Sequence, residues 1–165
     1  MKKIAITIMA IFLFSTISQA QEKFNNYSKL WKQVVQFEKD GLPKSALKIV
    51  EEISVKAKAN NNSTQIVKTL MFKSKYALTL EEDAQLKVIN GFKSQISISE
   101  FPTKNILESV LANLYWQYFN QNRYKFYNRT NTAEKVDKDD FRTWDLQTLF
   151  DEVHVHFKNS LKSGL

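Results

Sequence analysis

The side chains most suited to metal or acid–base chemistry lie in the last third of this 165-residue chain. His154 and His156 are the only histidines, and a helix would point their side chains about 200° apart. Metal ligands must converge, usually at i and i+4 on a helix, so we expect two histidines near the surface at a helix boundary. Asp137, Asp139 and Asp140 lack the glycine and the distal glutamate of an EF-hand loop. We therefore predict no metal site.

The other ingredients of enzyme sites are also missing from the sequence. The acidic run Glu81-Glu82-Asp83 is typical of a solvated turn, and no glycine-rich phosphate loop or serine nucleophile elbow occurs. With no cysteine in the chain, disulfides and thiol catalysis are excluded. The sequence predicts a protein that is not an enzyme and that needs no cofactor.

Aromatic side chains form the most distinctive pattern, because seven of the thirteen residues from 115 to 127 carry rings. These residues are Tyr115, Trp116, Tyr118, Phe119, Tyr124, Phe126 and Tyr127. Such a density indicates either a packed core or a stacking surface for a ligand such as a sugar. The first half continues an apolar helical stripe, which favours burial. We expect these seven residues and Trp144 to form a structural core, with the last three rings pinning a long loop onto the helices.

Helices must position these residues, since apolar side chains recur at three and four and the chain has only three glycines and two prolines. The pattern predicts an all-α fold of about six helices in antiparallel hairpins. The expected helices run over about 27–40, from Pro43 to about 59, from a Ser63 cap through Ala77, from Ala84 through Ile96, from Lys104 to about 122 and from Leu146 through Leu161, with a loop over 123–142. Thr143 is expected to cap the last helix.

A weak repeat signal lies in the first hairpin. Phe37, Gly41, Ala46 and Val50 fall at the spacing of the aromatic, glycine, alanine and bulky positions of a tetratricopeptide unit. Glycine and alanine would let two helices approach closely while the larger residues fill the groove between them. Both a repeat-like helical layer and a non-repeating bundle remain open at this stage.

The first twenty residues predict a secretory signal peptide. They combine a basic start at Lys2 and Lys3, an apolar run from Ile4 to Phe14 and a small-residue exit ending at Ala20. The run is too short for an ordinary membrane span. We expect an exported protein, periplasmic or extracellular in a bacterium, with a single helical domain over 21–165 that does not span a membrane after cleavage.

The charge of the chain points away from nucleic acid. The formal net charge of +7 falls to +5 when Lys2 and Lys3 leave with the signal peptide, and the remaining basic residues are scattered. Dispersed lysines on helix faces are usually solvated, so we expect a protein partner and no nucleic acid.

Three blocks carry a family resemblance: YSKLWKQVVQFEKDGLPKSALKIVEEI, LESVLANLYWQYFNQNRYKFYNRT and DDFRTWDLQTLFDEV. Together they resemble the helical start of exported bacterial proteins of the alpha-2-macroglobulin family, over about Tyr27 to Leu161. The resemblance implies protease trapping by the whole protein, in many members with a cysteine–glutamine thioester. This chain lacks the cysteine and the β domains, so the resemblance implies a leading helical domain that acts in scaffolding or partner docking, within a longer polypeptide.

Two hypotheses about function follow. The first is the non-catalytic helical domain of a protease-inhibitor-like protein, whose partners include further domains of the same polypeptide. The second is a stand-alone exported helical module that binds peptides or proteins in a groove between helix pairs.

Overall fold

The computed structural model describes residues 27–127, 129 and 137–162, which contain helices and no strand. A helical segment at 27–39 precedes α2 (Pro43–Ala59), α3 (Ser63–Leu80), α4 (Ala84–Ser97), α5 (Thr103–Tyr127), the short 3-10 helix η1 (Phe141–Thr143) and α6 (Leu146–Leu161). The all-α prediction is confirmed. The predicted signal peptide, residues 1–20, lies outside the described residues.

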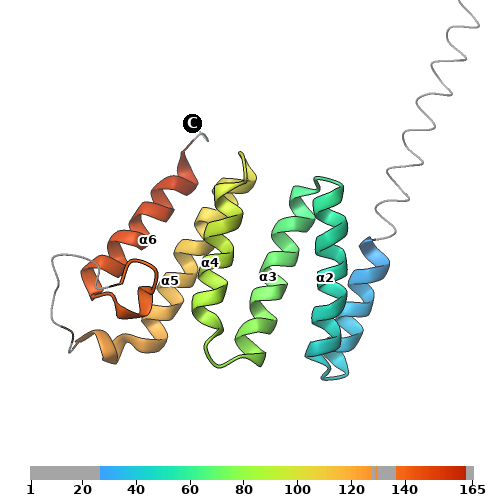
Figure 1. The fold of residues 1–165 in the computed structure, drawn as a ribbon, viewed down its shortest axis with the longest axis horizontal. Helices are drawn as coiled ribbons and strands as arrows, with labels where there is room; N and C mark the ends of the chain where they lie inside the picture. Colours follow the sequence, from blue (N-terminus) through green and yellow to red (C-terminus); the bar gives the residue numbers. More distant parts are fainter. Residues whose placement is uncertain (1–26, 128, 130–136, 163–165) are drawn as a thin grey trace, which may run out of the picture.

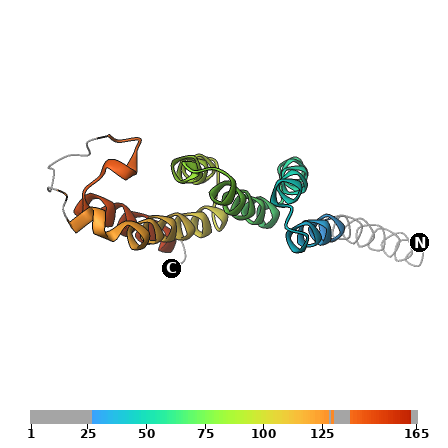
Figure 2. The same ribbon diagram turned by 90° about the horizontal axis from the view of Figure 1, so that it is seen from below.

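The helices stand side by side in a row that follows the chain (Figure 1). Seen from below, α2 and α4 lie in one layer, and the 27–39 segment, α3 and α5 lie in the other (Figure 2). The last helix, α6, runs beside α5 and does not continue the layer of α2 and α4. A repeat-like layer therefore describes the first four helices, whereas the α5–α6 hairpin packs differently. None of the described helices combines the length and apolar character needed to cross a bilayer.

The turn between the first two helices depends on a left-handed residue. Gly41 has φ of +68°, and the next amide, that of Leu42, donates a 2.8 Å hydrogen bond to the carbonyl of Phe37. The predicted helix stop at Gly41 is thus confirmed. Its predicted role in close helix approach is wrong, because a Cβ added there would meet no atom within 4 Å. The small residue at the helix contact is Ala46, which is fully buried together with Val50.

Two predicted helix caps are displaced by one or two residues. The side chain of Asn62, not Ser63, accepts a 3.1 Å hydrogen bond from the amide three residues later, at the start of α3. At α6 the carboxylate of Asp145 accepts the equivalent bond at 2.7 Å, while Thr143 belongs to η1. Asparagine and aspartate present a side-chain oxygen to these amides from the residue just before the helix, so they cap in both places.

Helix α5 is longer than predicted. It continues to Tyr127, so residues 123–127 are helical and not part of a loop. The reason is that Phe126 extends the buried stripe of α5, where its ring packs edge-on against Tyr118 at a centroid distance of 6.0 Å. That contact stabilises the last turn of the helix.

Two apolar clusters hold the row together. The N-terminal cluster joins the first three helices, and its buried members are Tyr27, Leu30, Trp31, Val34, Ala46, Val50, Ile53 and Tyr76. The C-terminal cluster joins α4, α5, η1 and α6, and its buried members are Val88, Ile89, Phe92, Ile96, Leu107, Leu111, Tyr115, Tyr118, Phe126, Phe141, Trp144, Leu149 and Val153. Partly buried side chains of α3 pack against both clusters, so this helix couples them.

The predicted aromatic core is only partly correct. Tyr115, Tyr118, Phe126 and Trp144 are buried, and Phe119 is partly buried against them. The other three rings are a correction: Trp116 is 44% exposed, Tyr124 74% and Tyr127 65%. Each of these three lies beyond the buried stripe of α5, because successive residues on a helix are rotated by about 100°.

Candidate functional site: an aromatic groove between α5 and α6

Three aromatic side chains from two helices converge on an open groove, which we call the aromatic groove. Trp116 of α5 and Phe150 and Phe157 of α6 line it, together with Val153, and its volume is about 670 Å³. Phe150 and Phe157 are seven residues apart, so they lie on the same side of α6. The groove follows the edge of the α5–α6 interface.

Ring contacts fix the position of Trp116 on one wall. Its ring centroid lies 5.8 Å from that of Phe150 and 5.6 Å from that of Phe119. Phe119 in turn packs against Phe150 at 4.9 Å with an interplanar angle of 66°. The indole is therefore held by neighbours on one side and open to solvent on the other, as expected for an amphipathic anchor.

Polar side chains line the outer edge of the aromatic groove. Gln147 donates a 2.8 Å hydrogen bond to the carboxylate of Asp151, one turn further along α6. His154 also lines the groove and is exposed, as the sequence predicted. An apolar floor with a polar rim is the usual anatomy of a protein-binding surface.

An ionic cluster lies buried under the α5–α6 interface. His156 places Nδ1 2.5 Å from a carboxylate oxygen of Glu108 on α5 and Nε2 3.5 Å from Glu152 on α6. The ring of Tyr115 stacks on the imidazole, with centroids 5.8 Å apart and planes at 19°. The prediction that His156 lies near the surface is wrong, since its residue is only 9% exposed.

The carboxylates determine the charge of His156. Burial by itself would lower the pKa of the imidazole, but the carboxylate of Glu152, 3.5 Å away, and the hydrogen-bonded carboxylate of Glu108 raise that pKa above its ordinary value. Burial also raises the pKa of Tyr115, helped by the charge of Glu152, so the phenol stays neutral. In its protonated form His156 joins α5 to α6 through an ion pair with Glu108.

This cluster was missed in the sequence, although a signal existed. Leu149, Val153 and His156 are spaced by four and three, which places His156 on the buried stripe of α6. Nothing in the sequence connects it to Glu108, which lies 48 residues earlier. Among the described residues, no group of three or more acidic or histidine side chains could hold a metal ion.

The acidic residues before α6 have structural roles. Asp140 accepts hydrogen bonds from the amide and the guanidinium of Arg142, and the guanidinium also contacts Asp83 at 3.1 Å. The hydrogen bond from the Arg142 side chain lowers the pKa of the Asp140 carboxyl, outweighing its burial. Asp137 accepts from the amide of Asp139 at 2.8 Å. The contact of Arg142 with Asp83 attaches η1 to the turn between α3 and α4, while the other bonds hold residues 137–142 together.

Comparisons with family models, with curated proteins and with solved structures gave no match to this chain. The resemblance to the alpha-2-macroglobulin family consequently stays a prediction based on the three sequence blocks.

Proposed function

We propose that this chain is a non-catalytic docking module that holds an amphipathic helix of a partner protein in the aromatic groove. The observation that carries the proposal is the convergence of Trp116, Phe150 and Phe157 on one open groove. Trp116 and Phe157 are 44% and 43% exposed, so each retains contact area for a partner. Exposed apolar side chains that gather in one place, with a polar rim, mark interaction sites.

A helix is the occupant that the shape of the groove favours. The groove runs along the edge of two packed helices, and a third helix can lay its apolar ridge between them at about 8–10 Å from each axis. Apolar side chains recur along α6 over three turns, from the partly buried Phe150 through Phe157, which is 43% exposed, to Leu161, which is 71% exposed. Apolar residues at i, i+3, i+4 and i+7 of a partner helix would cover this length.

The buried polar groups nearby support a structural role and not catalysis. The carboxylate of Glu108 and the imidazole of His156 pair with each other inside the α5–α6 interface, and neither residue lines any described cavity. A substrate needs contact with the reacting groups at hydrogen-bonding distance.

The family resemblance implies a different occupant for the aromatic groove than a helix of a separate partner protein. If the chain is the leading domain of an alpha-2-macroglobulin-like protein, the groove would receive a helix of a further domain of the same polypeptide. Sequencing the gene beyond the codon for Leu165 tests this alternative, which requires a continuing reading frame that encodes β-rich domains.

A site-specific photocrosslinker tests the docking proposal. We would place p-benzoylphenylalanine at Phe157, inside the groove, and at Tyr124 as a control, an aromatic position that is 74% exposed and outside the groove. Both full-length variants would be irradiated in the producing organism, and the crosslinked peptides would be sequenced by mass spectrometry.

The expected result is an adduct from position 157, absent from position 124, whose attached segment has helical apolar periodicity. A synthetic peptide of that segment should bind the purified protein, and Trp116→Ala should weaken binding by at least about tenfold, the loss of roughly 1.4 kcal/mol or more that an aromatic anchor implies. An adduct to a second copy of the chain, equal labelling at both positions, or an attached segment without helical periodicity would contradict the proposal.

A further inference from the structure

A second groove lies at the opposite end of the row, between the 27–39 segment and α3. Its volume is about 560 Å³, and we call it the lysine groove. Trp31 and Val35 contribute apolar surface, while the side chains of Lys32, Lys39 and Lys68 line the groove. Among residues 27–127, 129 and 137–162, no aspartate or glutamate lines it, and three lysines border its apolar floor.

The floor of the lysine groove is held in place by specific contacts. The indole Nε1 of Trp31 donates a 2.7 Å hydrogen bond to the side-chain oxygen of Gln65. Its ring also packs against Phe72, with centroids 4.8 Å apart, and the residue is only 9% exposed. Tyr27 accepts a 3.2 Å hydrogen bond from Asn60 of the α2–α3 turn. A ligand would therefore meet a pre-formed surface, which reduces the entropy lost on binding.

The three lysines are available to a ligand. Lys68 places its ammonium 4.0 Å from the centre of the Trp31 ring, and within the part of the chain that the structure describes, Lys32, Lys39 and Lys68 make no ion pair with a carboxylate. Another lysine of α3 behaves differently, since Lys75 lies 2.6 Å from the carboxylate of Glu38. No carboxylate of the described segments thus neutralises the positive charge of the lysine groove.

We propose that the lysine groove binds an acidic peptide segment that carries one apolar side chain. Lys32 and Lys39 are seven residues apart on one helix, so their attachment points are separated by about 10 Å along the axis. A peptide in polyproline II conformation presents every third side chain on one face, about 9 Å apart. Acidic residues at positions one and four would reach the two lysines, and Val35, which is 45% exposed, would contact an apolar residue between them.

The apolar floor distinguishes a peptide from other polyanions. A sulfated polysaccharide or a nucleic acid backbone would use the lysines but would leave the exposed part of Val35 without a matching apolar group. Stacked bases need an exposed ring face, whereas Trp31 is nine-tenths buried and covered by Lys68 on one face. Charge and apolar contact together favour the peptide.

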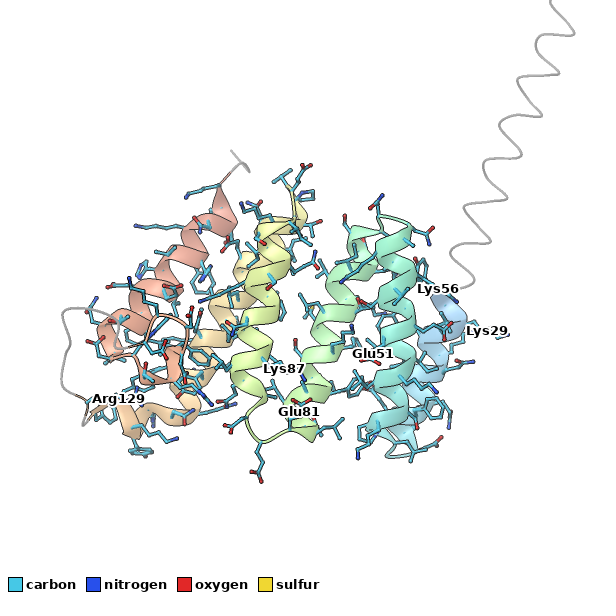
Figure 3. All side chains as sticks on the ribbon, viewed as in Figure 1. Lys29, Glu51, Lys56, Glu81, Lys87 and Arg129 are labelled. Atoms are coloured by element: carbon cyan, nitrogen blue, oxygen red, sulfur yellow. The ribbon has the colours of Figure 1, made fainter. Side chains whose placement is uncertain are left out.

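Fluorescence anisotropy tests the proposal. The full chain is titrated against a short labelled peptide that contains the sequence Glu-Leu-Ala-Glu. We expect saturable binding that weakens with added salt. The double variant Lys32→Gln/Lys39→Gln should lower the affinity about tenfold, because it removes two ion pairs at the rim of the groove. The matched control is Lys29→Gln/Lys44→Gln, which removes the same charge from exposed lysines that do not line the groove; Lys29 is labelled in Figure 3. It should change the affinity less than about twofold.

Two further measurements make the result decisive. Val35→Asp should abolish binding while the helical circular dichroism stays unchanged, because the side chain is already partly exposed. Replacing the leucine of the peptide by glycine should also weaken binding. The proposal is overturned by an absence of saturable binding, by equal losses in both double variants, or by tighter binding of heparin or an oligonucleotide at the same lysines. Trp116 lines the aromatic groove and does not line the lysine groove, so Trp116→Ala should leave this binding intact. The result for the lysine groove is therefore independent of the docking proposal.

Discussion

The N-terminal cluster combines rings such as Trp31 and Tyr76 with the small Ala46, whereas the C-terminal cluster has more buried rings and lies beside the buried pair of Glu108 and His156. The surfaces beside the clusters differ in the same way. The first carries lysines over a fixed floor, and the second carries exposed rings. The same all-helical architecture thus supports two chemically different surfaces, because the side chains that line the two grooves differ in charge and in exposed aromatic area.

The largest expected effect separates two tryptophans of the C-terminal half. Trp144 is fully buried, and its ring stacks on Tyr115 at 6.0 Å, so Trp144→Ala should lower the free energy of unfolding by roughly 3–5 kcal/mol. Trp116→Ala should lower it by only about 1 kcal/mol, since that side chain is 44% exposed. Urea denaturation of both variants checks this. Equal losses would mean that Trp116 belongs to the core after all.

The buried ion pair should be the next most sensitive feature. Glu108→Ala leaves His156 buried with only Glu152 at 3.5 Å, and we expect a loss of roughly 2–4 kcal/mol. Glu51→Ala, at an exposed position of α2 (Figure 3), is the charge-matched control and should stay within about 0.5 kcal/mol. A double-mutant cycle with His156→Leu measures the coupling, and a coupling near zero would contradict the ion pair.

A pH dependence should distinguish the two clusters, with a smaller effect than the loss of Glu108. The pKa of His156 is raised in the folded state, so its contribution to stability is complete below its unfolded pKa of about 6.5 and is lost as the pH rises through the folded pKa. Urea midpoints for the wild type should fall over this range. His156→Gln should remove that fall, and an unchanged slope in this variant would assign the pH effect elsewhere.

The smallest expected effects concern two glycines. Gly41→Ala should destabilise the fold by about 1 kcal/mol, because φ of +68° disfavours any residue with a Cβ. Gly91→Ala, within α4, should stabilise it by up to about 1 kcal/mol, since the added Cβ meets nothing within 4 Å. Thermal melts of the pair test whether backbone conformation, and not crowding, is what Gly41 supplies. Similar melting temperatures for the two variants would contradict this.

Periodicity predicts the helices well because burial of one face determines both the pattern and the fold. The expected spans of α2 and α4 agree with the structure. The end of α5 was missed because polar residues interrupt the run there, although Phe126 continues the spacing of Tyr115 and Tyr118. Local patterns predict local structure.

The aromatic groove and the ion pair could not be predicted in the same way. Whether Trp116 is buried depends on how α6 docks on α5, a relation between residues more than 30 positions apart. The pairing of Glu108 with His156 is likewise tertiary, and burial of a glutamate goes against the usual preference of that residue. The lysine groove combines the 27–39 segment with α3, so its three charges look scattered in the sequence.

The contacts of Trp144 link the chain just after α5 to the chain just before η1. The guanidinium of Arg129, labelled in Figure 3, donates a 2.6 Å hydrogen bond to the carbonyl of Trp144, and the indole of Trp144 donates to the carbonyl of Asp137 at 2.5 Å. One fully buried residue therefore anchors both a residue that follows α5 and a residue that precedes η1. Its backbone and its side chain each hold one of them, so a substitution of the indole would remove the bond to Asp137 and leave the bond from Arg129 in place.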